Sequence, residues 1–197
     1  MPPANDHYYT AEPSSDHRPG EVRFCYGGRE LVFATDSGVF SRRELDRGTE
    51  GLLAALSESV AGPVLDMGCG YGTIGGAVGA RWPGLAVTMA DVNRRACDLA
   101  RENARRNGVR AEVLESDGYI ALTGRRFATI LQNPPIRAGK AVIYRMFADG
   151  AASLLLRSLQ SRGEPQKEPG TYAENEKKNG GPLLRFALRE SLILQDF

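Results

Sequence analysis

Histidine, cysteine and long apolar runs are scarce in this chain of 197 residues, and each scarcity excludes a class of function. The two histidines, His7 and His17, leave little from which to build a Ser-His-Asp triad or a histidine-rich site, so we expect no metal. The three cysteines are odd in number and widely spaced, which argues against a disulfide framework or a zinc site. No apolar run approaches the roughly 20 residues of a membrane-spanning helix, and the N-terminus does not resemble a signal peptide. We expect a cytoplasmic protein without membrane contact.

Charge is nearly balanced, at a net +1, so no overall field draws the chain to nucleic acid. Contacts with phosphates would need local clusters, and Arg137 with Lys140 forms one candidate. Only four of the 25 basic residues are lysines, and three of these lie at positions 167, 177 and 178. This shift in composition distinguishes the C-terminal segment from the rest of the chain.

Short apolar segments alternate with helical segments through the middle of the chain. We expect strands over residues 64–67, 85–90, 110–115 and 127–131, and helices over residues 73–81, 94–106 and 141–156. This alternation predicts an α/β fold with a doubly wound, mostly parallel sheet that helices cover on both faces. Ahead of it, residues 21–26 and 29–35 alternate around Gly27-Gly28 and predict a β-hairpin, and residues 45–56 predict a short helix.

The chain divides into three expected parts. Residues 1–60 form an N-terminal arm, a hairpin and a helix packed on the core, residues 61–156 form the core, and residues 157–197 form an atypical, poorly ordered polar segment. Residues 157–181 are rich in Gly, Pro, Glu and Lys, which predicts a loop or disorder. Residues 182–197 have room for one helix or one strand, so we expect C-terminal strands of the sheet to be atypical or missing. An uncovered sheet edge would permit self-association.

Polar residues lie at or just past the ends of four successive strands of the core: Asp66, Asp91, Asp117 and Asn133. Ligands of doubly wound sheets bind beyond these carboxyl ends, and the turn over residues 68–72 (GCGYG) lets backbone approach a ligand closely. The turn differs from the G-x-G-x-x-G fingerprint of dinucleotide sites. A carboxylate directly ahead of it repels a pyrophosphate but favours a cation such as the sulfonium of S-adenosylmethionine. We therefore expect S-adenosylmethionine rather than NAD.

Four stretches of the sequence resemble the class I S-adenosylmethionine-dependent methyltransferases. They are residues 64–72 (VLDMGCGYG), 91–93 (DVN) with the helix that follows, 116–118 (SDG), and 133–140 (NPPIRAGK). The group that they resemble most is the bacterial small-subunit ribosomal RNA guanine-N2 methyltransferases with their short single-domain relatives. The resemblance runs from about His7 to about Ala152. It implies a Rossmann-like core that binds S-adenosylmethionine, and ribosomal RNA or the small ribosomal subunit as partner.

The same resemblance implies a role for each site residue. The cofactor-binding set is Thr49, Asp66, Gly68, Gly70, Asp91, Asp117 and Gly118. Within it, Asp66 and the two turn glycines would line the methionine end, Asp91 would bind the ribose hydroxyls, and Asp117 would accept from the adenine amino group. Thr49 would close the pocket. The catalytic pair is Asn133 and Pro134, and the substrate-binding set is Pro135, Ile136, Arg137 and Lys140.

The Asn-Pro-Pro loop suits methyl transfer to an amine. An exocyclic amine such as guanine N2 is a poor nucleophile because its lone pair is delocalised into the ring. Two acceptors, the Asn133 side-chain oxygen and the Pro134 carbonyl, would draw that nitrogen toward tetrahedral geometry, and proline restricts the backbone that holds them. A glutamine amide and adenine N6 are alternative substrates, although loops for them usually end in an aromatic residue where this chain has Ile136. A degenerate, noncatalytic binding module is the remaining hypothesis, because the C-terminal segment departs from the family pattern.

Overall fold

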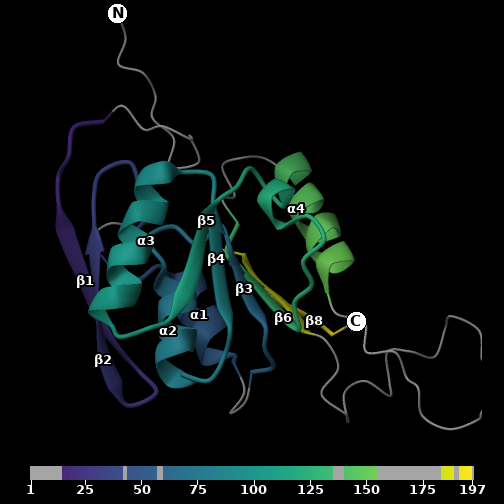
Figure 1. Cartoon of the computed structure of the whole chain (residues 1–197), viewed down its shortest axis with the longest axis horizontal. Coiled ribbons are helices and arrows are strands. Elements are labelled where there is room, and N and C mark those ends of the chain that lie inside the picture. Colours follow the sequence, from purple (N-terminus) through teal and green to yellow (C-terminus); the bar gives the residue numbers. More distant parts are fainter. Residues whose placement is uncertain are drawn as a thin grey trace, which may run out of the picture.

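The computed structural model describes residues 15–41, 44–56, 60–134, 140–154, 183–188 and 191–196. Its main sheet has six strands in the order β5-β4-β3-β6-β7-β8, which cross the molecule in Figure 1. The parallel strands are β3 (Val64–Met67), β4 (Val87–Asp91), β5 (Ala111–Glu115), β6 (Thr129–Gln132) and β7 (Leu183–Leu188). The edge strand β8 (Ser191–Asp196) runs antiparallel to β7.

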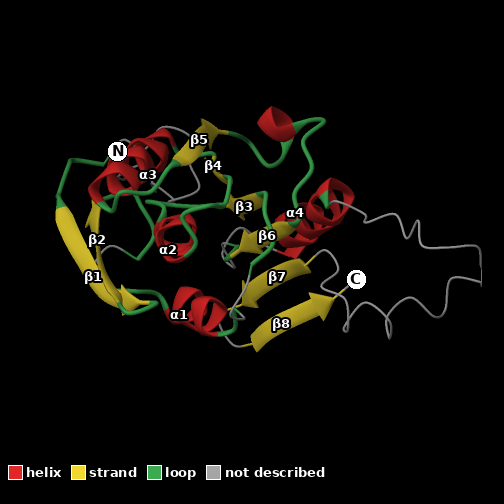
Figure 2. Cartoon of the chain, turned by 60° about the horizontal axis from the view of Figure 1, so that its bottom comes forward, coloured by secondary structure: helices red, strands yellow, loops and turns green. Residues whose placement is uncertain are grey.

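Helices cover both faces of this sheet, as Figure 2 shows, and this confirms the doubly wound α/β prediction. One face carries α1 (Arg47–Ala54), α2 (Thr73–Arg81) and α3 (Arg94–Arg106); the other carries α4 (Lys140–Ser153) and the short 3₁₀ turn η1 (Ile120–Leu122). The predicted hairpin is present as β1 (Gly20–Tyr26) and β2 (Arg29–Thr35), and both turn glycines have positive φ. Among the described residues, no helix is long and apolar enough to cross a membrane.

Helix α2 is buried between the sheet and the hairpin because its sequence is rich in small residues. A Cβ atom at Gly75 would lie 2.8 Å from the Met89 side chain, and one at Gly76 would lie 2.8 Å from the Phe33 ring. Glycine therefore permits a three-layer packing in which Phe33 and Leu31 of the hairpin are fully buried. The hairpin therefore packs on the core through α2.

Asn103 of α3 and Asn107, the C-cap residue of that helix, bond to the backbone of β2 along the edge that does not pair with β1. The Asn103 side chain accepts from Ala34 N (2.7 Å) and donates to the carbonyls of Ala34 and Tyr71 (2.9 Å each). One helical turn further on, Asn107 exchanges the same pair of bonds with Val32, at 3.0 and 2.8 Å. Because both asparagines are buried, these amides satisfy backbone groups that would otherwise lack partners.

We expect Asn103→Ala to destabilise the chain by about 2 kcal/mol, because it removes three hydrogen bonds and leaves buried backbone groups unpaired. Urea unfolding followed by circular dichroism measures this loss. The exposed Arg105→Ala, on the same helix, is the matched control and should change stability by less than about 0.5 kcal/mol. Equal effects of the two substitutions would contradict the proposed part of Asn103 in docking the hairpin.

The C-terminal segment differs from its prediction. Where the sequence predicts one helix or one strand after residue 181, the structure has the two strands β7 and β8, with residues 189 and 190 between them. A hairpin fits because a two-residue connection suffices for antiparallel strands. β7 pairs in parallel with the whole of β6, from Thr129↔Leu183 to Gln132↔Phe186. The apolar edge that suggested self-association is therefore covered; the polar stretch predicted to be a loop over residues 157–181 lies outside the described residues.

Candidate functional site

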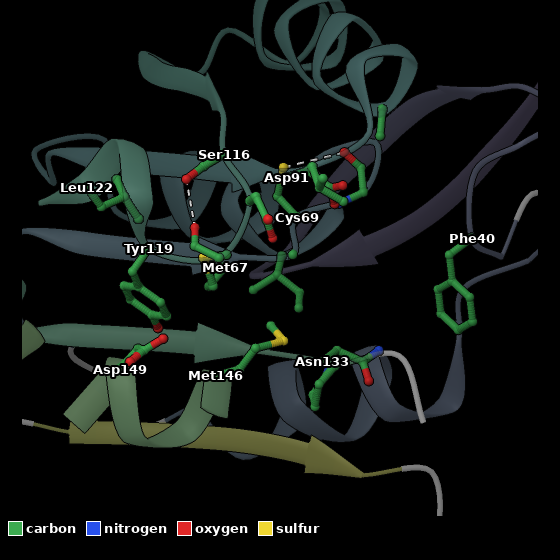
Figure 3. A pocket seen from close by; sticks show the side chains of 18 of the residues that line it. Phe40, Met67, Cys69, Asp91, Ser116, Tyr119, Leu122, Asn133, Met146 and Asp149 are labelled. Atoms are coloured by element: carbon green, nitrogen blue, oxygen red, sulfur yellow. Dashed lines mark hydrogen bonds between the residues drawn. The ribbon is translucent and has the colours of Figure 1, made fainter. Parts of the chain in front are cut away.

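The carboxyl ends of the parallel strands open into a cavity of about 690 Å³, a size usual for small-molecule sites. Its walls are the loop after β2, the glycine turn after β3, the end of β4, the loop after β5, the end of β6, and α4. Figure 3 shows Phe40 and Asn133 at one end of the cavity and Tyr119 with Asp149 at the other. The switch point of the sheet, where strand order reverses between β3 and β6, lies between these ends.

Most of the predicted site residues meet at this cavity. Its lining includes Thr49, Gly68, Gly70, Asp91, Asp117, Gly118, Asn133 and Pro134. Asp66 is not among the lining residues. Residues 135–137, which contain the predicted substrate contacts Pro135, Ile136 and Arg137, lie outside the described residues, as does the side chain of Lys140 at the start of α4.

The glycine turn presents bare backbone to the cavity. Gly68 and Gly70 have φ values of +72° and +55°, a region that side chains rarely adopt. A Cβ atom at Gly70 would meet no described atom within 4 Å, so this part of the turn faces open space. A ligand can therefore approach the main chain directly.

Asp91 joins the end of β4 to this turn. Its Oδ2 accepts from Gly70 N at 2.8 Å, and its Oδ1 accepts from Asn93 N at 2.9 Å. Burial raises the pKa of this carboxyl, and the bonds from backbone N–H groups oppose the rise. Asp91 is also among the residues that line the cavity, and carboxylate oxygens accept hydrogen bonds of the kind that hydroxyl groups donate.

Asp66 lies behind the turn rather than in the cavity. Its carboxylate is fully buried, and Oδ2 accepts from Gly75 N, at the start of α2, at 2.7 Å. The other oxygen, Oδ1, has no hydrogen-bond partner among the described residues. Burial, helped by the nearby charge of Asp91, raises the pKa of Asp66 to about 7. The residue therefore binds the start of α2 and does not line the cavity, where the sequence had predicted it.

We expect Asp66→Asn to change how stability depends on pH. The pKa of this carboxyl is about 7 in the folded chain and about 4 when unfolded, so folding takes up a proton between these values. Stability consequently falls as pH rises through that window, by at most about 1.4 kcal/mol per pH unit. The variant lacks this component, so its free energy of unfolding relative to wild type should rise from pH 5 to pH 8. Urea titrations at several pH values measure it; a constant difference would contradict the shifted pKa.

The Asn133 carboxamide is held by the first turn of α1. Its Nδ2 donates to Asp46 Oδ2 at 2.9 Å and to Thr49 Oγ1 at 3.0 Å. Asp46 is also the N-cap of α1, and the same Oδ2 accepts from Gly48 N and Thr49 N. All three side chains line the cavity. Asp46 was missed by the sequence analysis, although its place as an Asp directly before a helix could have indicated an N-cap.

Further residues of the cavity were given no role in the sequence prediction. Tyr119 accepts from Gln132 Nε2 at 2.7 Å, and burial raises the pKa of its hydroxyl above the usual range. Phe40 belongs to the loop after β2, which is fixed by bonds from Asn93 Nδ2 to Gly38 O (2.8 Å) and from Tyr71 OH to Ser41 O (3.1 Å). Both aromatic side chains could contact a flat ligand.

A bare glycine turn, a carboxylate at the next strand end and an Asn-Pro pair around one cavity define a class I S-adenosylmethionine-dependent methyltransferase. Residues 30–164 match the family described as "Methyltransferase small domain", and the chain belongs to this family. It is 39% identical over 153 residues to the uncharacterized protein YbxB of Bacillus subtilis strain 168, with 76% of each protein covered.

Two further relatives carry a described activity. The chain is 43% identical over 125 residues to the ribosomal RNA small subunit methyltransferase C of Aeromonas hydrophila, covering 64% of this chain and 36% of that protein. The structure resembles the Thermus thermophilus 16S rRNA N2 G1207 methyltransferase, solved in complex with AdoMet and guanosine. That match has a TM-score of 0.65 at 29% identity and covers 73% of this chain and 41% of that one. The chain thus spans well under half the length of these two relatives.

These comparisons confirm the predicted family, fold class and cofactor. The chain is a methyltransferase that uses S-adenosylmethionine, and two of the relatives reported above are named as methyltransferases of small-subunit ribosomal RNA. The hypothesis of a degenerate module rested on a missing strand beside β6, and β7 occupies that place.

Proposed function

We propose that this chain methylates the exocyclic N2 atom of a guanine in the RNA of the small ribosomal subunit, in the cytoplasm. One observation carries the proposal: Asn133 and Pro134 line the same cavity as Gly70 and Asp91. Acceptors for a substrate amine and groups suited to S-adenosylmethionine thus share one space. The relatives named for methylating small-subunit RNA support the choice of substrate.

The residues present fit S-adenosylmethionine. The open space beside Gly70 leaves room for the methionine end of the cofactor. The carboxylate of Asp91 would accept from its ribose hydroxyls, and Asp117 with Gly118, on the loop after β5, would contact its adenine. When bound, this cofactor supplies an electrophilic methyl group on a sulfonium. Asp66, placed behind the turn, would contribute by fixing the start of α2 rather than by direct contact.

The chain's own residues would act by alignment. The Asn133 Oδ1 and the Pro134 carbonyl each accept one N–H of the guanine amine, so that its lone pair turns out of the ring plane and toward the cofactor site. Good positioning of this kind can supply roughly 7 to 11 kcal/mol of a barrier. No strong base is needed before transfer, which agrees with the absence of histidine from the described part of the cavity lining.

Incubation of the full chain with small ribosomal subunits or their RNA and a labelled methyl donor tests the proposal. Nucleoside analysis should detect N2-methylguanosine. Formation of N6-methyladenine, or of methylated glutamine in ribosomal protein, would keep methyl transfer to nitrogen but overturn the substrate. Calorimetry in which the folded chain fails to bind S-adenosylmethionine would overturn the cofactor roles proposed above.

A further inference from the structure

The first turn of α1 lies against the Asn133 carboxamide more closely than a side chain at position 48 would allow. A Cβ atom at Gly48 would be 2.9 Å from Asp46 Oδ2 and 3.1 Å from Asn133 Oδ1. Gly48 is buried, and Thr49 beside it is only 6% exposed. The backbone of this turn, its capping carboxylate and the amide therefore form one packed unit at the cavity wall.

Asp46 and Thr49 determine which way the amide points. An ionised carboxylate only accepts hydrogen bonds, so the amide group that faces Asp46 must be the nitrogen. The second hydrogen of Nδ2 is directed to Thr49 Oγ1. A flipped amide would put Oδ1 against the carboxylate and lose both bonds. With its two hydrogens engaged, Asn133 can offer a ligand only its oxygen.

We propose that Asp46 and Thr49 are positioning residues that hold the Asn133 carboxamide with Oδ1 toward the substrate amine. The inference rests on the proposed function, and it restricts the group that contacts Asn133 to one that donates a hydrogen bond, as the N–H of an amine does. Since Asp46 is charged, its bond to Nδ2 also polarises the amide and strengthens Oδ1 as an acceptor. The sequence places Asp46 and Asn133 87 residues apart, and only the fold joins them.

Matched substitutions test the inference by the rate of methyl transfer at saturating cofactor. Thr49→Val keeps the shape of the side chain but removes the acceptor, and should lower the rate about 3- to 10-fold. Thr49→Ser restores the hydroxyl and should recover most of that loss. Asp46→Ala should cost about 10-fold or more, while Asp46→Asn, which keeps an oxygen that can cap α1, should lie between. Glu50→Gln removes a charge from the exposed face of α1 and should leave the rate unchanged.

A double-substitution cycle separates positioning from a merely structural effect. If Asp46 acts through Asn133, then Asp46→Ala should lower the rate less than about 2-fold in a chain that already carries Asn133→Ala. A further loss as large as in the wild-type background would overturn the proposal. Equal rates for Thr49→Val and Thr49→Ser would overturn the part assigned to Thr49.

A measurement without substrate keeps this inference distinct from the proposed function. In the ¹⁵N-labelled chain, the side-chain NH₂ signals of Asn133 are identified by their loss in Asn133→Ala. These signals should shift and exchange faster with solvent in Thr49→Val and Asp46→Ala, but not in Glu50→Gln. Unchanged signals in both α1 variants would overturn the inference. If the signals shift in these variants while the wild type methylates no guanine, the result supports the orientation of the Asn133 amide and overturns the proposed substrate.

Discussion

Asn133→Ala should reduce methyl transfer about 10²- to 10³-fold while leaving the affinity for S-adenosylmethionine within about 2-fold of wild type. We take the size of the loss from enzymes in which one oxyanion-hole donor has been removed. In both cases the reacting group loses one preorganised polar contact. The side chain lies at the end of β6, bonded to Asp46 and Thr49 rather than to the glycine turn. Single-turnover rates and calorimetry on the same preparation measure the two quantities.

Thermal unfolding of the Asn133 variant serves as a control for folding. Its loss of two hydrogen bonds to α1 should lower stability only modestly, since Asn133 is partly exposed. Undiminished transfer would contradict the proposed mechanism. Equal losses in rate and in cofactor affinity would instead indicate that Asn133 contacts the cofactor.

Asp91→Ala is expected to weaken S-adenosylmethionine binding about 10- to 100-fold. The substitution removes the carboxylate proposed for the ribose and also leaves Gly70 N and Asn93 N without their acceptor. Hydrogen bonds to charged groups are each worth about 1.5 to 3 kcal/mol, which sets this range. Calorimetric titration with the cofactor or its demethylated product gives the dissociation constant.

Asp98→Ala is the matched control, because it removes an exposed carboxylate from α3 and should leave the dissociation constant unchanged. An unchanged constant in Asp91→Ala would mean that the carboxylate neither binds the cofactor nor shapes the turn that does.

The order of elements in the core is predictable because each strand is a short apolar run between helical segments. Helices α2 and α3 begin and end at the predicted residues, and strand ends shift by at most two residues. The C-terminal strands are harder to predict, because two short strands separated by two residues resemble a single amphipathic element in the sequence. Parallel pairing of β7 with β6 also depends on a contact across some 50 residues of chain, which no local pattern records.

The candidate site, too, could be predicted only in part from the sequence. Sequence motifs locate the residues at strand ends. Successive side chains of a strand point to opposite faces of the sheet, so adjacent residues have different surroundings. Met67 and Gly68 line the cavity, whereas Asp66 points to the start of α2. Asp46 could not be paired with Asn133 from the sequence, because their bond depends on how α1 packs beside β6.

Asn103 and Asn107 limit where this domain can be divided. A chain trimmed to begin at residue 61 would keep every parallel strand, yet it would expose Asn103 and Asn107 beside the apolar surface that Leu31 and Phe33 now cover. It would also lose the loop that Asn93 and Tyr71 fix at the rim of the cavity. The shortest unit that can be expressed, transplanted or fused with its cavity intact therefore begins ahead of the hairpin, not at the first strand of the main sheet.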